Sequence, residues 1–124
     1  ADFITYMDRA RQPFNVNSVA QAGAAAALDD RLFLWRTKRL VARGRKYFYR
    51  RLKRHGFRFV LSEANFILID CERESDGVFQ DFLRHGIIVR SMKAYGLPTW
   101  IRVTVGRRLE NARFIRVLRT VTGK

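Results

Sequence analysis

Residues 31–70 read RLFLWRTKRLVARGRKYFYRRLKRHGFRFVLSEANFILID, and the hydrophobic period changes within this stretch. Asp29 or Asp30 can cap the start of a long helix, and Gly56 is placed to end it near residue 55. After Gly56, residues 57–61 and 65–70 read as strands separated by a short turn. Apolar residues of the helix fall on one broad face at helical spacing: Phe33, Leu34, Thr37, Leu40, Val41, Gly44, Phe48 and Leu52.

The sequence on either side of this stretch supplies further helices and strands. Asn17 or Ser18 can cap an alanine-rich helix that extends to residue 28. Residues 76–85 predict a short helix that Gly86 ends, and residues 109–121 predict a last helix. Residues 87–90 and 100–105 read as strands. This order predicts one two-layer α+β domain over residues 1–124, with a mostly antiparallel sheet of about four strands and helices packed on one face.

Composition favours a folded globule and excludes several classes of protein. The chain has 124 residues, is 48% hydrophobic and contains ten Phe. No run of 18 apolar residues is present, so we expect no membrane span, and the first residues do not resemble a signal peptide. The single cysteine, Cys71, excludes an internal disulfide and gives no metal cluster. We expect a cytoplasmic or recombinant setting.

Positive charge is concentrated on the long helix. The net charge is +14, and residues 31–58 hold twelve of the 25 Lys and Arg residues without one Asp or Glu. This surplus predicts salt-sensitive association with polyanions. Leu32 and Trp35 stand at i, i+3 spacing on the charged side, where they serve either as packing under the N-terminal segment or as part of a binding surface.

Four strings resemble one enzyme family in order and spacing. They are RQPFNVN at 11–17, SEANFILID at 62–70, GIIVR at 86–90 and YGLPTWIRVTVG at 95–106. Together they resemble the C-terminal small domain of histidinol-phosphate aminotransferases, which belong to the fold-type I enzymes that use pyridoxal phosphate. The resemblance covers essentially the whole chain.

What the resemblance implies for catalysis is mostly negative. The family's Schiff-base lysine and phosphate-cradling loop lie in a large domain that this sequence does not contain. We therefore expect no catalytic residue, no bound cofactor and no activity of the chain alone. By motif, Arg102 matches the arginine that grips the substrate's α-carboxylate, and Arg90 matches one that contacts its phosphate. Without the large domain, both can also be ordinary arginines in solvent.

Departures from the family pattern suggest an altered surface. Relatives usually carry acidic residues at positions held here by Arg31, Leu32, Trp35, Arg36 and Arg45, and at Arg107, Arg108 and Leu109. Residues 24–27 also look trimmed to alanine. Positive charge at a helix N-terminus opposes the helix macrodipole, so helix formation does not explain it. These features favour an excised domain with a redesigned surface.

Three functions remain open on this basis. The first is an engineered, non-catalytic binding module whose Leu32 and Trp35 insert into an acidic-rimmed apolar groove of a partner protein, with rim contacts from Arg36, Arg39 and Arg43. The alternative is a fragment of a histidinol-phosphate aminotransferase that contacts substrate through Arg90 and Arg102. The third is a basic nucleic-acid-binding domain, although no helix-turn-helix, zinc or RNA-binding signature accompanies the charge. A leftover apolar face would also permit a homodimer.

Overall fold

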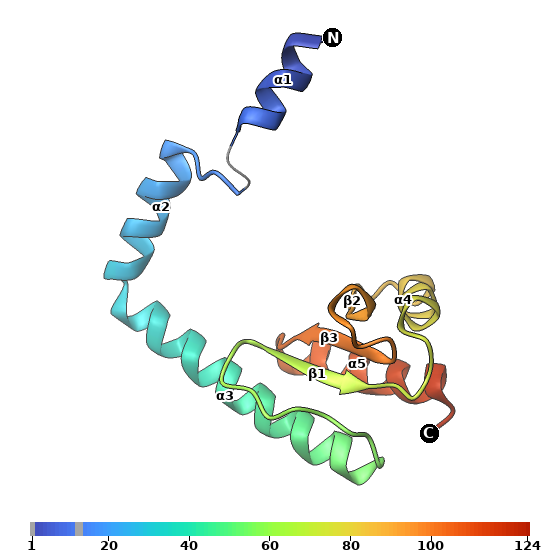
Figure 1. Ribbon diagram of the computed structural model, residues 1–124. Coiled ribbons are helices and arrows are strands. Elements are labelled where there is room, and N and C mark those ends of the chain that lie inside the picture. Colours follow the sequence, from blue (N-terminus) through green and yellow to red (C-terminus); the bar gives the residue numbers. More distant parts are fainter. Residues whose placement is uncertain (1, 12–13) are drawn as a thin grey trace. The chain divides into compact units, whose positions relative to one another are not determined.

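The computed structural model describes residues 2–11 and 14–124 (Figure 1). Gln12 and Pro13, part of the first family-like string, lie outside the described residues. The chain divides into two compact units, Ala1–Arg36 and Thr37–Lys124.

The first unit is helical and has little buried surface. It contains α1 (Asp2–Ala10), α2 (Ser18–Asp29) and the first residues of α3 (Arg31–Arg54). Asn17 caps α2 by accepting a hydrogen bond from the Ala20 N–H at 2.8 Å, and Asp30 caps α3 by accepting one from the Phe33 N–H at 2.8 Å. Both caps confirm the sequence-based expectation. The sequence did not predict α1, and no residue of α2 is buried.

The second unit contains the sheet. Strands β1 (Phe66–Asp70), β2 (Arg90–Ser91) and β3 (Trp100–Thr104) lie in the order β1-β3-β2, and both pairings are antiparallel. The remaining elements are α4 (Ser75–Arg84), the 3₁₀ turn η1 (Lys93–Tyr95) and α5 (Arg108–Thr122). The predicted α+β class is therefore confirmed, with three strands in place of about four.

The core lies where three helices meet one face of the sheet. Phe114 of α5 is 3% exposed; it packs edge-to-face on Phe48 of α3 and stacks on Phe82 of α4. From the sheet, Ile67 and Ile101 complete the cluster. Full burial of side chains of this size contributes about 1.5–3 kcal/mol each, so these contacts hold the second unit together.

The strand predicted at 57–61 does not form. Only one bridge, Phe59 to Ile69, joins this segment to β1. The physical reason lies at Ser62, whose N–H donates to the Tyr49 hydroxyl at 2.9 Å while that hydroxyl donates back to the Ser62 carbonyl at 3.1 Å. Because the Tyr49 hydroxyl bonds both the N–H and the carbonyl of Ser62, the backbone hydrogen bonds between this segment and β1 cannot continue past Val60.

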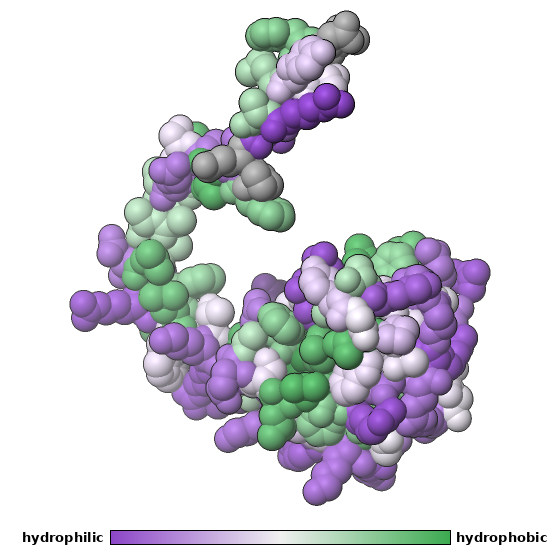
Figure 2. Space-filling view, viewed as in Figure 1, coloured by the Kyte–Doolittle hydropathy of each residue, from purple (hydrophilic) through white to green (hydrophobic). Residues whose placement is uncertain are grey.

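The apolar face predicted for the long helix is buried only in its second half. Burial begins at Gly44 and continues with Phe48 and Leu52, whereas Phe33 is 56% exposed and Leu34 is only half-buried. The sequence placed Phe33 and Leu34 on the same face as Phe48 and Leu52, but neither of the two is buried. Figure 2 shows hydrophobic side chains on the surface of the first unit. None of the described helices has the length and apolar character needed to cross a membrane.

Candidate functional site

The two arginines that carry over from the family motifs lie opposite each other. Arg90 of β2 pairs with Arg102 of β3 in the antiparallel register. Directly paired residues leave the same face of a sheet, with Cβ atoms about 4.5–5.5 Å apart. Ile101 and Val103 alternate with Arg102 and are buried, so Arg102 points away from the core. The structure thus brings Arg90 and Arg102 together on the outer face of the sheet.

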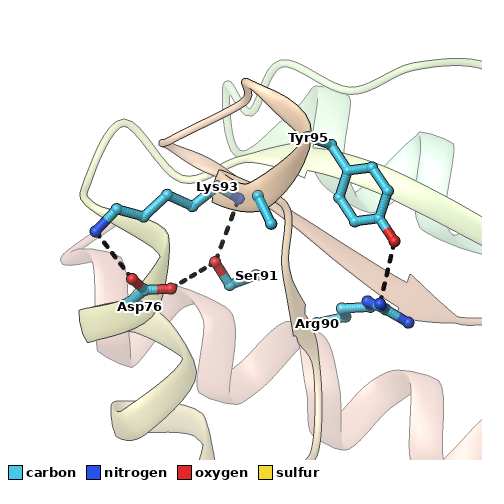
Figure 3. Close-up of a pocket in the computed structure, with 6 residues that line it drawn as sticks. Asp76, Arg90, Ser91, Lys93 and Tyr95 are labelled. Atoms are coloured by element: carbon cyan, nitrogen blue, oxygen red, sulfur yellow. Dashed lines mark hydrogen bonds and ion pairs between the residues drawn. The ribbon is translucent and has the colours of Figure 1, made fainter. Parts of the chain in front are cut away.

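Tyr95 holds the side chain of Arg90. The Arg90 Nη2 atom donates to the Tyr95 hydroxyl at 3.1 Å, and the guanidinium carbon lies 5.6 Å from the Tyr95 ring centroid (Figure 3). Tyr95 is placed by η1, which ends at Gly96 with a φ of 76°, a conformation that favours glycine. Sequence reasoning did not assign Tyr95 a role, although the Tyr-Gly-Leu-Pro string contained it.

An aromatic ring also supports Arg102. The Arg102 guanidinium carbon lies 5.0 Å from the ring centroid of Phe66 on β1. Among the described residues, neither Arg102 nor Arg90 forms an ion pair with a carboxylate. Two neighbouring guanidinium groups with no described counter-charge make this face of the sheet suited to an anion.

A hollow of about 470 Å³ opens beside Arg90. Arg102 does not line it, so the hollow and the arginine pair overlap only at Arg90. Figure 3 shows the lining side chains, which come from the start of α4, from β2 and from η1: Asp76, Arg90, Ser91, Lys93, Ala94 and Tyr95.

The opposite wall of the hollow is a closed network of charges. The Lys93 ammonium donates to Glu74 at 2.8 Å and to Asp76 at 3.0 Å, and the Ser91 hydroxyl donates to Asp76 at 2.6 Å. The hydrogen bond from Lys93 lowers the pKa of Glu74, and hydrogen bonds from Ser91 and then Lys93 lower that of Asp76. The same two carboxylates raise the pKa of Lys93, so all three groups are charged at neutral pH.

The described lysines do not fit a Schiff base with pyridoxal phosphate. An amine nucleophile needs a lowered pKa, yet Lys93 is held protonated by two carboxylates. Lys124 pairs with Glu72 at 2.9 Å, and the other lysines lie exposed on α3: Lys38, Lys46 and Lys53. This chain alone therefore offers the cofactor no covalent anchor among its described residues.

The residues predicted for a protein-binding surface are not part of this site. They lie along α3, with Leu32, Trp35 and Arg36 in the first unit and Arg39 and Arg43 in the second. Leu32 is 54% exposed and Trp35 is 55% exposed. Their binding role stays a prediction, as does the redesign of the surface.

Chains of solved aminotransferase structures share this arrangement of helices and strands. A crystal structure from Burkholderia pseudomallei, described provisionally as an aminotransferase, matches with a TM-score of 0.76 and 26% identity over 98% of this chain and 37% of that chain. The histidinol-phosphate aminotransferase from Clostridium acetobutylicum has the same fold, with a TM-score of 0.76 and 24% identity over 91% of this chain and 35% of that chain.

Sequence comparison assigns the family. The model of the aminotransferase class I and II family matches residues 1–118, and the chain belongs to this family. It is 47% identical over 120 residues to histidinol-phosphate aminotransferase 1 of Nitrosococcus oceani, and the matched region covers 97% of this chain and 32% of that protein. It is 48% identical over 115 residues to a histidinol-phosphate aminotransferase of Geobacillus sp., covering 93% of this chain and 32% of that protein. The chain spans about a third of the length of these relatives.

Proposed function

We propose that this chain is the small domain of a histidinol-phosphate aminotransferase and that it binds the anionic groups of the substrate. The observation that carries the proposal is the cross-strand pair Arg90–Arg102, which lies without a described carboxylate partner in a chain 47% identical to such an enzyme. In this role Arg90 binds the phosphate of histidinol phosphate, and Arg102 binds the α-carboxylate of the amino-acid substrate with which the amino group is exchanged.

The chemistry of the two arginines supports this assignment. A guanidinium group is planar, stays charged and offers paired N–H donors that match both carboxylate and phosphate. Phe66 and Tyr95 restrict the two side chains from the side, which lowers the entropy lost when an anion binds. Lys93 does not compete for the anion, because Glu74 and Asp76 already neutralise its charge.

The chain alone is expected to be inactive as an aminotransferase. Pyridoxal phosphate supplies the electron sink of this reaction, and the described lysines provide no anchor for it. The remaining two-thirds of an enzyme would have to supply the cofactor site. The contribution of this chain is to bind and orient the substrate.

A chimera tests the proposal. This chain replaces the corresponding third of the Nitrosococcus oceani enzyme, and amino-group transfer from histidinol phosphate is measured. Loss of a charge-assisted, bidentate contact removes about 1.5–3 kcal/mol of binding. Arg90→Gln should therefore lower kcat/KM for histidinol phosphate by roughly 10- to 100-fold, and Arg102→Gln should lower kcat/KM for the carboxylate-bearing co-substrate by a similar factor. Arg108→Gln, an exposed arginine on α5, is the matched control and should leave kcat/KM unchanged.

Two outcomes count against the assignment. One is a chimera that shows cofactor absorbance and yet does not turn over histidinol phosphate. The other is an active chimera in which Arg90→Gln and Arg102→Gln behave like Arg108→Gln. Cofactor absorbance separates both outcomes from simple misfolding.

A further inference from the structure

Helix α3 carries a row of exposed cations on the side that faces away from the core. Gly44, Phe48 and Leu52 mark the buried side, and the row lies opposite them. We call it the basic row: Arg43, Lys46, Arg50 and Arg54, all exposed. At a rise of 1.5 Å per residue, the row extends about 16 Å along the helix, with positions four residues apart separated by about 6 Å.

A concavity lies beside the C-terminal end of the basic row. It has a volume of about 300 Å³ and is lined by Tyr47, Arg50, Arg51 and Arg54. The Arg51 guanidinium carbon lies 5.6 Å from the Tyr47 ring centroid, and Tyr47 itself packs edge-to-face on the buried Phe48. Three guanidinium groups therefore line one hollow whose aromatic wall is anchored in the core.

The charge of the basic row is not neutralised within the described part of the chain. Glu63 pairs with Arg45 of α3, and Arg45 is not in the row. Like charges four residues apart destabilise a helix, so the row does not serve the fold. The charge of one residue of the row, Arg54, also acts on the His55 imidazole. Its pKa is lowered by partial burial and then by the charges of Arg119, Arg54 and Arg51.

We propose that the basic row and its adjoining hollow bind the phosphate backbone of a nucleic acid without reading its sequence. An extended ligand fits better than a compact anion, because a single phosphate would occupy the hollow and leave Arg43 and Lys46 without a role. The 6 Å steps of the row suit a strand that carries a charge every few ångströms.

Two other ligands have to be separated from a nucleic acid. A helix that lies on a membrane needs an apolar face for the lipid, and the apolar face of this half of α3 is buried in the protein core. A carboxylate polyanion offers guanidinium groups the same bidentate contact, so poly-glutamate serves as the competitor that distinguishes it from a phosphate backbone. The basic row shares no residue with the Arg90–Arg102 pair, so this inference is independent of the proposed aminotransferase role.

Binding of a fluorescein-labelled, mixed-sequence 20-nucleotide DNA strand to the full chain tests the inference by fluorescence anisotropy. The triple variant Arg43→Gln/Arg50→Gln/Arg54→Gln removes three phosphate contacts. At a slope of about −0.7 per contact on single strands, it should bind about 100-fold more weakly at 0.1 M salt and shift the slope of log K against log[salt] by about 2.

The control variant removes the same net charge at other places. Arg9→Gln/Arg84→Gln/Arg108→Gln changes exposed arginines on α1, α4 and α5. Because this control keeps every residue of the basic row and of the hollow, its affinity should fall less than about threefold. Circular dichroism confirms that both triple variants are folded.

A second readout locates the contact. Titration of the His55 ring by NMR should show its pKa rising when the strand is bound, because the phosphates offset Arg51, Arg54 and Arg119. Three results would overturn the inference: an equal loss of affinity in both triple variants, an unchanged His55, or equally effective displacement of the strand by poly-glutamate.

Discussion

At the scale of single residues, the contact between α3 and the start of α5 depends on a glycine. A Cβ atom at Gly44 would lie 2.2 Å from Val105 Cγ1 and 3.1 Å from Asn111 Nδ2. Asn111 is 3% exposed and uses both ends of its amide, accepting from the Gly106 N–H and donating to the Gly106 carbonyl. The close approach of α3 thus rests on a hydrogen-bonded loop that cannot move aside without losing these bonds.

Gly44→Ala should therefore destabilise the second unit although alanine favours helix. Overpacking of a core typically costs about 1–3 kcal/mol, which exceeds the gain of up to about 1 kcal/mol in helix propensity. Urea unfolding followed by circular dichroism measures the difference. Gly23→Ala on α2 is the control, because a Cβ there meets no atom within 4 Å, and it should cause no loss. Equal stability of the two variants would contradict this account of Gly44.

The Lys93 network gives stability a defined pH dependence. Hydrogen bonds lower the pKa of Glu74 from its ordinary value of 4.5 and that of Asp76 from 3.8. A depressed pKa adds stability that is present above the ordinary value and lost as the pH falls through the lowered one. A raised pKa at Lys93 adds stability below 10.5 that is lost only at higher pH.

Between pH 5 and about pH 3, the wild type should thus lose more stability than Lys93→Met, which lacks the ammonium that both carboxylates bind. The measurement is the urea midpoint at successive pH values. Lys46→Met removes an exposed lysine of α3 and is the control; its urea midpoint should fall with decreasing pH as steeply as that of the wild type. If Lys93→Met kept that slope as well, the network would make no contribution to acid stability.

At the scale of elements, local signals could be predicted from the sequence and long-range pairings could not. The ends of the helices lie where the sequence predicted them: Asn17 and Asp30 cap the starts of α2 and α3, and Gly56 and Gly86 follow the ends of α3 and α4. These positions could be predicted because helix caps and glycines with positive φ act on residues close to them in the sequence. The prediction of a strand at 57–61 was wrong because the hydroxyl of Tyr49, thirteen residues before Ser62, forms hydrogen bonds with the backbone of Ser62.

The candidate site shows the same division between local and distant information. Arg90 and Arg102 were recognisable from their motifs, but their direct pairing depends on the register of β2 on β3. The support of Arg90 by Tyr95 depends on the 3₁₀ turn between them, for which no pattern in the sequence was decisive.

Helix α3 has an exposed apolar end, and tryptophan fluorescence can test it. Trp35 is 55% exposed, whereas Trp100 is half-buried. Subtracting the spectrum of Trp35→Phe from that of the wild type should give the red-shifted emission of an indole in water, unchanged between low and high salt. Blue-shifted emission from Trp35 at low protein concentration would show that other residues cover it, and the predicted protein-binding surface would lose its central side chain.

At the scale of the whole molecule, stability resides in the second unit. All buried apolar side chains of the described core lie between Gly44 and Leu118, and α2 buries nothing. Deleting residues 1–29 keeps Asp30, which caps α3, and should change the free energy of unfolding by less than about 1 kcal/mol, because no buried contact is lost.

Denaturant unfolding of the shortened chain checks this distribution of stability. Its m-value should fall only slightly, since m follows the surface that unfolding exposes. A chain that fails to fold without residues 1–29, while remaining folded with them, would show that the first unit supports the core after all.

The hydroxyl of Tyr49 has a consequence for the chain's behaviour at high concentration. An unpaired edge of a β-sheet is a template onto which another molecule can add a strand, the first step toward fibrils. On β1 the outer edge meets residues 58–60, and beyond them Tyr49 saturates both backbone groups of Ser62. A single phenol thus leaves Ser62 with no free backbone group to offer the strand of a second copy.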